Sequence, residues 1–220
     1  MLELAAESGC TMLSIGFESI SRKTLESVHK HVNRPENFAA LVEKVHSYGI
    51  MVFGLFIFGF DGDGPSVFDE TVDFNIKAGY DACAYSALTP YPGTLTWYEM
   101  RRANRIVSFD WTMYDQGRVV YRPALMAADE LRIGLDRAYG NFYSMSSIAS
   151  RFPLRGKRHR AQWAIYNAFM RKASRTSNIK SIAPATAPPE AAPMPPILPI
   201  KREWRAAVLE AAGGPEPHPN

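Results

Sequence analysis

Residues 49–64, GIMVFGLFIFGFDGDG, are the stretch that decides the predicted fold. Positions 50–60 are almost uninterruptedly apolar and rich in aromatic and β-branched residues, which pack well on a pleated surface. The run is too short to cross a bilayer, so it predicts a strand buried on both faces. A glycine-rich acidic loop follows it. This arrangement is typical of parallel α/β proteins, whose binding groups gather at the carboxyl ends of the strands.

Strands and helices alternate around this stretch. Residues 11–17 (TMLSIGF) and 81–88 (DACAYSAL) predict two further buried strands. Helices are expected over 2–8, over 21–29 after a Ser21 cap, from Pro35 to Gly49, from Pro65 to Gly79, and over 95–103. Because the unit repeats about every 35 residues, the sequence predicts right-handed crossovers and a parallel sheet.

The pattern changes after Arg105. A short strand over 118–121 and a long helix over 129–150 are expected, and Leu131, Leu135, Ala138 and Phe142 recur on one side of that helix. Residues 151–175 place aromatic side chains between basic ends. This pattern favours a solvated peripheral helix, with an amphipathic partner helix or membrane-surface helix as the alternative.

Composition limits the broad class of protein. The 220 residues, 46% of them hydrophobic, suffice for a full domain with a core, and a net charge of +3 gives no reason to expect a nucleic-acid partner. The isolated Cys10 and Cys83 form no disulfide framework, which favours a reducing compartment, and no signal peptide or membrane-spanning run is present; we expect a cytoplasmic protein.

The two ends of the chain differ from its middle. Seven of the 16 prolines fall between 184 and 199, so residues 176–220 are predicted to form a disordered Pro/Ala-rich tail. At the other end, the chain starts with a helix that ends at Gly9, as if inside a repeating unit. We expect the chain to be a fragment of a longer protein.

Common ligand motifs fail on the acidic loop. A calcium loop starting at Asp61 would need acidic residues where Pro65 and Val72 stand, and a phosphate-binding glycine triplet lacks its third glycine at Val67. The loop is either a turn capped by its own aspartates or a ligand contact. His29 and His31 lack a further ligand apart from His46, so no metal site is assigned. Glu18 follows a buried strand, where its charge needs a ligand, a partner or the start of the next helix.

Three segments together resemble the second half of a radical S-adenosylmethionine enzyme of the kind that carries a cobalamin-binding domain ahead of the radical domain. They are residues 3–19 (ELAAESGCTMLSIGFES), 54–63 (GLFIFGFDGD) and 88–94 (LTPYPGT), which look like strands four to six of its partial barrel. Residues 110–151 look like the accessory segment of one branch of the family. The resemblance implies an α/β fold: the C-terminal part of a partial TIM-like (β/α) barrel, then a mainly helical appendage, with domains 1–105, 106–175 and 176–220.

The family's cluster-binding loop is absent from this sequence. The resemblance implies three cysteines in a C-x-x-x-C-x-x-C loop that hold a four-iron four-sulfur (4Fe-4S) cluster, and neither Cys10 nor Cys83 replaces them. S-adenosylmethionine, the cluster and optionally cobalamin are therefore expected in a longer enzyme that carries out radical chemistry such as methylation. This chain by itself is expected to be inactive, because it lacks the three cysteines. Its missing N-terminal half is the expected partner of this chain, and the substrate is a small or lipid-like molecule. The alternative is a non-catalytic scaffold module or a decayed remnant.

The resemblance also assigns binding residues, but no catalytic or metal-binding residue in this chain. Glu18 and Ser19 would contact the methionine or ribose part of S-adenosylmethionine. Ile57 and Gly59 match the second half of a G-x-I-x-G pattern whose backbone approaches the adenine, although Leu55 occupies the first glycine position. The rest of the pocket would be lined by Asp61, Pro90 and Tyr91.

Overall fold

The computed structural model describes residues 1–152, 159–176 and 186. All of these lie in one compact unit, Met1–Thr186. The predicted tail lies outside the described residues, apart from Thr176 and Thr186. Within the described part of the chain, no helix is long and apolar enough to cross a membrane.

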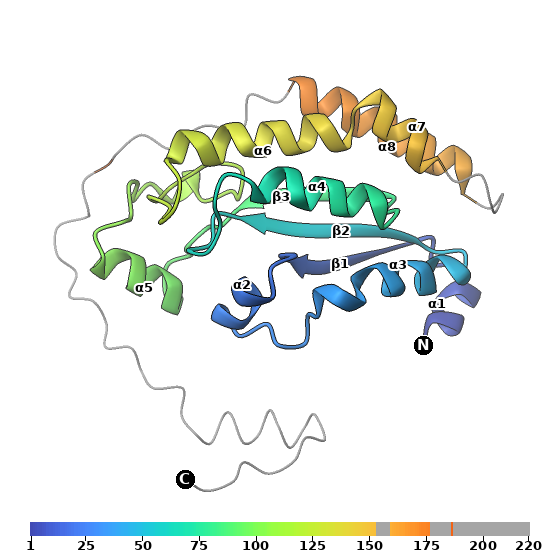
Figure 1. Ribbon diagram of the computed structural model, residues 1–220, viewed down its shortest axis with the longest axis horizontal. Coiled ribbons are helices and arrows are strands. Elements are labelled where there is room, and N and C mark those ends of the chain that lie inside the picture. The colour runs from blue at the N-terminus through green and yellow to red at the C-terminus, as the bar shows by residue number, and fades with distance from the viewer. Residues whose placement is uncertain (153–158, 177–185, 187–220) are drawn as a thin grey trace, which may run out of the picture. The chain divides into compact units, whose positions relative to one another are not determined.

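Three parallel strands form the sheet, in the order β1 (Met12–Glu18), β2 (Met51–Phe58) and β3 (Ala82–Ala87). The predicted parallel α/β class is therefore confirmed, with β2 in the centre (Figure 1). This sheet is open: among the described residues, no further strand pairs with the outer edge of β1 or of β3.

Helices precede and follow each strand, as the alternating pattern predicts. Their bounds are α1 Leu2–Glu7, α2 Arg22–Ser27, the 3-10 turn Pro35–Asn37, α3 Phe38–Ser47, α4 Val67–Lys77, α5 Leu95–Arg102, the 3-10 turn Trp111–Met113, α6 Ala128–Phe142, α7 Met145–Arg151 and α8 Arg160–Thr176. Ser21 caps α2 as predicted, because its Oγ accepts a hydrogen bond from the Thr24 amide at 3.2 Å. Gly9, Gly49 and Gly79 have positive φ just after α1, α3 and α4.

One face of the sheet is the core of the unit. Phe17, Phe56, Phe58 and Tyr85 are buried there, each no more than 3% exposed. Phe38 of α3 lies 4.7 Å from Phe17, measured between ring centroids, and the matching distance from Phe68 of α4 to Phe58 is 4.8 Å. Helices α3 and α4 therefore cover this face.

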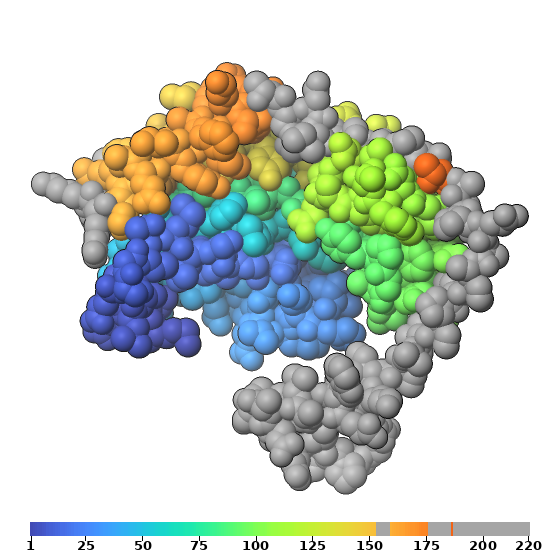
Figure 2. All heavy atoms as spheres, turned by 180° about the vertical axis from the view of Figure 1, so that it is seen from behind, coloured from blue at the N-terminus to red at the C-terminus, as the bar shows by residue number. Residues whose placement is uncertain are grey.

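The opposite face is only partly covered, so the predicted burial of β2 on both sides is wrong. Met51 and Ala82, near the start of β2 and β3, are buried on this face, but most of its other residues are exposed or half-buried: Ser14, Gly16, Phe53, Leu55, Ile57, Ala84 and Ser86. Tyr166 of α8 lies 6.0 Å from Phe53 between ring centroids and covers part of this face. Figure 2 shows cyan atoms from the β2 part of the chain still at the surface beside α8. We call this the open face of the sheet.

Tyrosines in and just after helix α6 provide hydrogen-bond partners for backbone groups on the outer edge of β3. The Tyr143 hydroxyl bonds both the amide (3.0 Å) and the carbonyl (2.7 Å) of Cys83, and the Tyr139 hydroxyl accepts from the Tyr85 amide at 3.0 Å. Two side chains thus replace a neighbouring strand, since buried backbone groups must find partners.

Two predictions for the second half of the chain are wrong. Residues 118–121 form no strand; Tyr121 makes a single antiparallel bridge with Ile106. The long helix predicted over 129–150 is two helices, α6 and α7, because Ser144 starts a new one by accepting from the Ser147 amide at 3.2 Å. The apolar side of α6 is confirmed, since Leu131, Leu135, Ala138 and Phe142 are all buried.

Arg151 ties α7 and α8 to the start of β3, although the sequence pattern placed it in a solvated basic stretch. It is buried and lies 3.8 Å above the Phe142 ring. Its guanidinium donates to the carbonyls of Tyr80 (2.9 Å), Asp81 (3.1 Å) and Phe142 (2.9 Å), and to the side chains of Ser147 and Asn167. The prediction of a solvated α8 is wrong on this side, where Trp163 and Asn167 are buried.

We predict opposite effects for two glycine substitutions in α6. A Cβ on Gly134 would lie 2.3 Å from the ring of Phe68, which is itself held in the core, so Gly134→Ala should destabilise the fold by about 1–3 kcal/mol. A Cβ on Gly140 meets nothing within 4 Å, so Gly140→Ala should stabilise it by roughly 0.5–1 kcal/mol. Urea unfolding of both variants tests this, and equal effects would contradict the packing.

Candidate functional site

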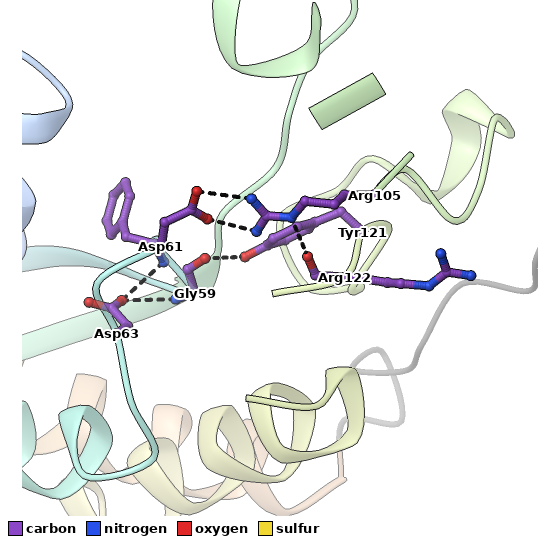
Figure 3. A network of polar contacts seen from close by, with 7 residues as sticks. Gly59, Asp61, Asp63, Arg105, Tyr121 and Arg122 are labelled. Atoms are coloured by element: carbon purple, nitrogen blue, oxygen red, sulfur yellow. Dashed lines mark hydrogen bonds and ion pairs between the residues drawn. The ribbon is translucent and has the colours of Figure 1, made fainter. Parts of the chain in front are cut away.

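A capped turn follows β2 at the carboxyl end of the sheet. Oδ2 of Asp63 accepts hydrogen bonds from the amides of Gly59 (3.0 Å) and Phe60 (3.1 Å) (Figure 3). Its Oδ1 accepts from the Thr24 hydroxyl at 3.4 Å, which joins the turn to α2. Asp63 is only 3% exposed. Of the two interpretations of the acidic loop, the capped turn therefore describes Asp63.

Burial makes Asp63 an unusual carboxyl group. It raises the pKa of Asp63 from its ordinary 3.8 to about 6, and this effect outweighs the backbone donors, which favour the charged form. The turn is thus held by a group that changes charge near neutral pH.

Asp61 points the other way and meets the segment after α5. Its carboxylate forms a two-pronged ion pair with Arg105, at 2.9 and 2.7 Å. The Nε of Arg105 donates to the Arg122 carbonyl at 2.8 Å, and the Tyr121 hydroxyl donates to the Gly59 carbonyl (Figure 3). Arg105 and Tyr121 together therefore clamp the appended segment onto the turn after β2.

The structure explains why residue 59 is glycine. Its φ is +96°, and a Cβ would lie 2.2 Å from the Tyr121 hydroxyl and 2.7 Å from Leu131. Any side chain would be strained and would break the clamp. The chain's own packing thus requires this glycine.

Glu18 ends β1 in a strained conformation. It is a non-glycine residue with φ of +65°, and the pairing register between β1 and β2 shifts at this point. Its Oε1 lies 3.3 Å from Nζ of Lys30, a side chain that is 53% exposed. The neighbouring Ser19 is buried, and its Oγ accepts from the Ser21 amide at 3.1 Å.

The remaining predicted residues follow β2 and β3. Ile57 pairs with Ser86 and is half-buried on the open face. Pro90 is buried, whereas Tyr91 is 41% exposed and its hydroxyl accepts from Gln116 at 3.0 Å. All seven predicted residues lie at or just beyond the carboxyl ends of the strands. Direct contacts join the turn to α2 and to the appended segment. Within the described part of the chain, no hydrogen bond or ion pair joins Glu18 to Asp61 or Tyr91.

Sequence patterns missed Arg105, Tyr121 and Thr24, which hold the turn. Arg105 and Tyr121 lie 44 and 62 residues from their partners Asp61 and Gly59. No periodic pattern reports such distant pairs. The closely spaced aspartates were the one local signal, and they marked the turn correctly.

A separate cavity of about 700 Å³ lies at the opposite end of the strands, and it is lined by residues such as His46, Asp81 and Trp163. One polar contact among its lining residues is a 2.7 Å bond between Nε2 of His46 and Oδ2 of Asp81, which also accepts from the Val52 amide. This bond fixes the start of β2 beside α3. The cavity contains none of the predicted site residues.

The described residues do not fit an iron–sulfur cluster. They contain no group of three or more His, Cys, Asp or Glu side chains that could hold a metal. Cys83 is fully buried in the core, which raises the pKa of its thiol well above the usual value, and the Cys10 thiol donates to the Met12 carbonyl at 3.5 Å.

These features define an open α/β unit whose candidate site lies at the carboxyl ends of parallel strands. The chain is 36% identical to the bacteriochlorophyllide d C-12(1)-methyltransferase of Chlorobaculum tepidum over 173 residues. The aligned region covers 77% of this chain and 37% of that protein. The chain is 30% identical to the C-8(2)-methyltransferase of the same organism over 151 residues, 66% of this chain and 32% of that protein. No family model matches the chain.

A more distant relative is the hopanoid C-2 methylase of Rhodopseudomonas palustris, 27% identical over 110 residues, half of this chain and 21% of that protein. The chain spans about a third of the length of the two bacteriochlorophyllide methyltransferases. These homologues support the resemblance to radical S-adenosylmethionine enzymes, and the names of these three relatives describe methylation.

The Asp63 pKa predicts a pH-dependent stability. Because the folded-state pKa (about 6) exceeds the unfolded one (3.8), the native state holds this proton more tightly, and stability falls as pH rises between these values. Relative to Asp63→Asn, the natural chain should lose on the order of 2 kcal/mol of unfolding free energy from pH 4 to pH 7. Urea unfolding at both pH values measures this. Parallel curves would contradict a buried, titrating Asp63.

Proposed function

We propose that this chain is the C-terminal part of a radical S-adenosylmethionine enzyme that methylates a small or lipid-like molecule. The observation that carries the proposal is the similarity to two bacteriochlorophyllide methyltransferases over most of this chain, together with the candidate site at the carboxyl ends of the parallel strands. The names of the relatives support methylation as the reaction type, and the residues gathered at the carboxyl ends of the strands support this end of the sheet as the binding site.

In this proposal, residues 1–105 are part of a partial barrel, residues 106–175 are its accessory segment and residues 176–220 are a tail. The open face of the sheet would then line the interior of the barrel. Half-buried apolar residues such as Leu55 and Ile57 suit that role, since they can pack against an apolar ligand. The outer edge of β1 would pair with a strand from the preceding part of the enzyme.

Glu18 and Ser19 would hold the methionine or ribose part of S-adenosylmethionine. The strained backbone and shifted register at Glu18 are features that cluster at binding sites. A ligand ammonium could replace the exposed Lys30 as the partner of this carboxylate.

Ile57 and Gly59 would lie beside the adenine, with Asp61, Pro90 and Tyr91 around the rest of the pocket. In this assignment the ligand approaches Ile57 from the open face, because Asp63 and Tyr121 already occupy the amide and carbonyl of Gly59. The clamp of Arg105 and Tyr121 would position this turn without touching the ligand.

The 4Fe-4S cluster must come from outside this chain, since the described residues do not fit it. When bound in the full enzyme, the cluster and S-adenosylmethionine supply the radical that activates the substrate. Cobalamin, if used, would also belong to the preceding part. The missing N-terminal half of the same protein is therefore the proposed partner.

The reading frame upstream of the Met1 codon tests this proposal first. We expect a continuous frame with a C-x-x-x-C-x-x-C motif roughly 100 residues before this chain. The extended protein, reconstituted with iron and sulfide without oxygen, should then cleave S-adenosylmethionine. A stop codon directly before Met1, or a frame without the cysteines, would favour the alternative, a non-catalytic scaffold module or decayed remnant.

A single substitution tests the assigned role of Glu18 in that extended protein. Glu18→Gln removes a charged acceptor, so we expect affinity for S-adenosylmethionine to fall by about tenfold or more, measured by calorimetry. Glu7→Gln is the matched control, since Glu7 is exposed on α1 and lies outside the site. Equal affinities for both variants would remove Glu18 from the site.

A further inference from the structure

Helix α8 carries an exposed apolar stripe on its outer side. Ile165 is 70% exposed and Phe169 is 65% exposed. At helical spacing they lie on one side with the exposed Ala161, Ala164 and Ala168. We call these five residues the α8 stripe.

The inner side of α8 fixes the direction in which the stripe points. Trp163 and Asn167 are 2% and 1% exposed. The Asn167 amide donates to the Asp81 carbonyl at 3.1 Å, and its oxygen accepts from Arg151 at 3.3 Å. Because these buried polar bonds would be lost, α8 cannot rotate to hide the stripe.

Charge on α8 has one sign. The helix contains Arg160, Arg171, Lys172 and Arg175 and no acidic residue. Lys172 and Arg175 are exposed and follow the stripe on the same side of the helix. An apolar stripe with basic residues at its end is typical of helices that lie in a membrane interface.

We propose that α8 docks this protein on the surface of an anionic lipid bilayer, with the helix parallel to the membrane plane. Such a surface supplies both an apolar layer for Ile165 and Phe169 and negative charge for Lys172 and Arg175. A second copy of the chain fits less well, because it would bring the same positive charge to the same face. The proposal is independent of the proposed enzyme activity.

Vesicle flotation of the 220-residue chain tests the docking surface. We expect binding to phosphatidylcholine vesicles that contain phosphatidylglycerol, weaker binding to pure phosphatidylcholine, and weakening by salt. Failure to bind the anionic vesicles, or equal binding to both, would overturn the proposal.

Matched variants distinguish membrane binding by the α8 stripe from nonspecific hydrophobic binding by other exposed residues. The double variant Ile165→Gln and Phe169→Gln should lower partitioning by about tenfold or more, since each loses apolar burial. Ile133→Gln is the control, because Ile133 is 51% exposed on α6 and should leave binding unchanged. Thermal melts followed by circular dichroism confirm that each variant is folded. Equal binding by the double variant and the natural chain would overturn the proposal.

Charge variants test the contribution of the basic residues that follow the α8 stripe. Lys172→Gln with Arg175→Gln should reduce binding by about fivefold for each cation removed, whereas the exposed pair Lys23→Gln with Lys44→Gln should have little effect. Sedimentation identifies the competing outcome. If the stripe variant converts a dimer to a monomer while vesicle binding stays unchanged, the stripe is a self-association surface and the membrane proposal is wrong.

Discussion

The fold depends on a three-stranded parallel sheet, whose outer edge needs hydrogen-bond partners and whose apolar faces need to be covered by other side chains. Buried backbone groups require hydrogen-bond partners, and parallel sheets normally have both faces covered. At β3, the hydroxyls of Tyr139 and Tyr143 replace the missing neighbour strand. Arg151 of α7 donates hydrogen bonds to the Tyr80 and Asp81 carbonyls just before that strand. It also bonds Asn167 of α8, so it anchors both α7 and α8. The appended helices are therefore part of the sheet's own stability.

The same constraint explains the contrast between the two faces. The face under α3 and α4 is filled by packed aromatic rings, while the open face carries small and half-buried residues. An apolar surface of this kind is typical of a ligand site or of packing against further protein. It is the feature of the fold that best accommodates the proposed place of this chain in a larger enzyme.

At the carboxyl ends of the strands, buried polar contacts set the shape of the candidate site. Asp63 closes the turn after β2, and Arg105 and Tyr121 hold that turn from the accessory segment. The segment after the sheet thus shapes the site without supplying a predicted ligand contact. Glu18 differs, because it combines a strained backbone with a carboxylate whose ion-pair partner, Lys30, has a side chain that is 53% exposed, while the Glu18 side chain itself is 17% exposed.

The sequence by itself determined the order of the strands and helices from α1 to α5, the parallel class, the Ser21 cap and the buried side of α6, because these depend on local periodicity and capping chemistry. It also marked the acidic turn after β2. The break between α6 and α7, the open face of β2 and the roles of Arg151 and Tyr121 were decided only by the tertiary structure. Each depends on partners distant in the sequence, such as Gly59 for Tyr121 and Tyr80 for Arg151, and local patterns carry no information about such pairs.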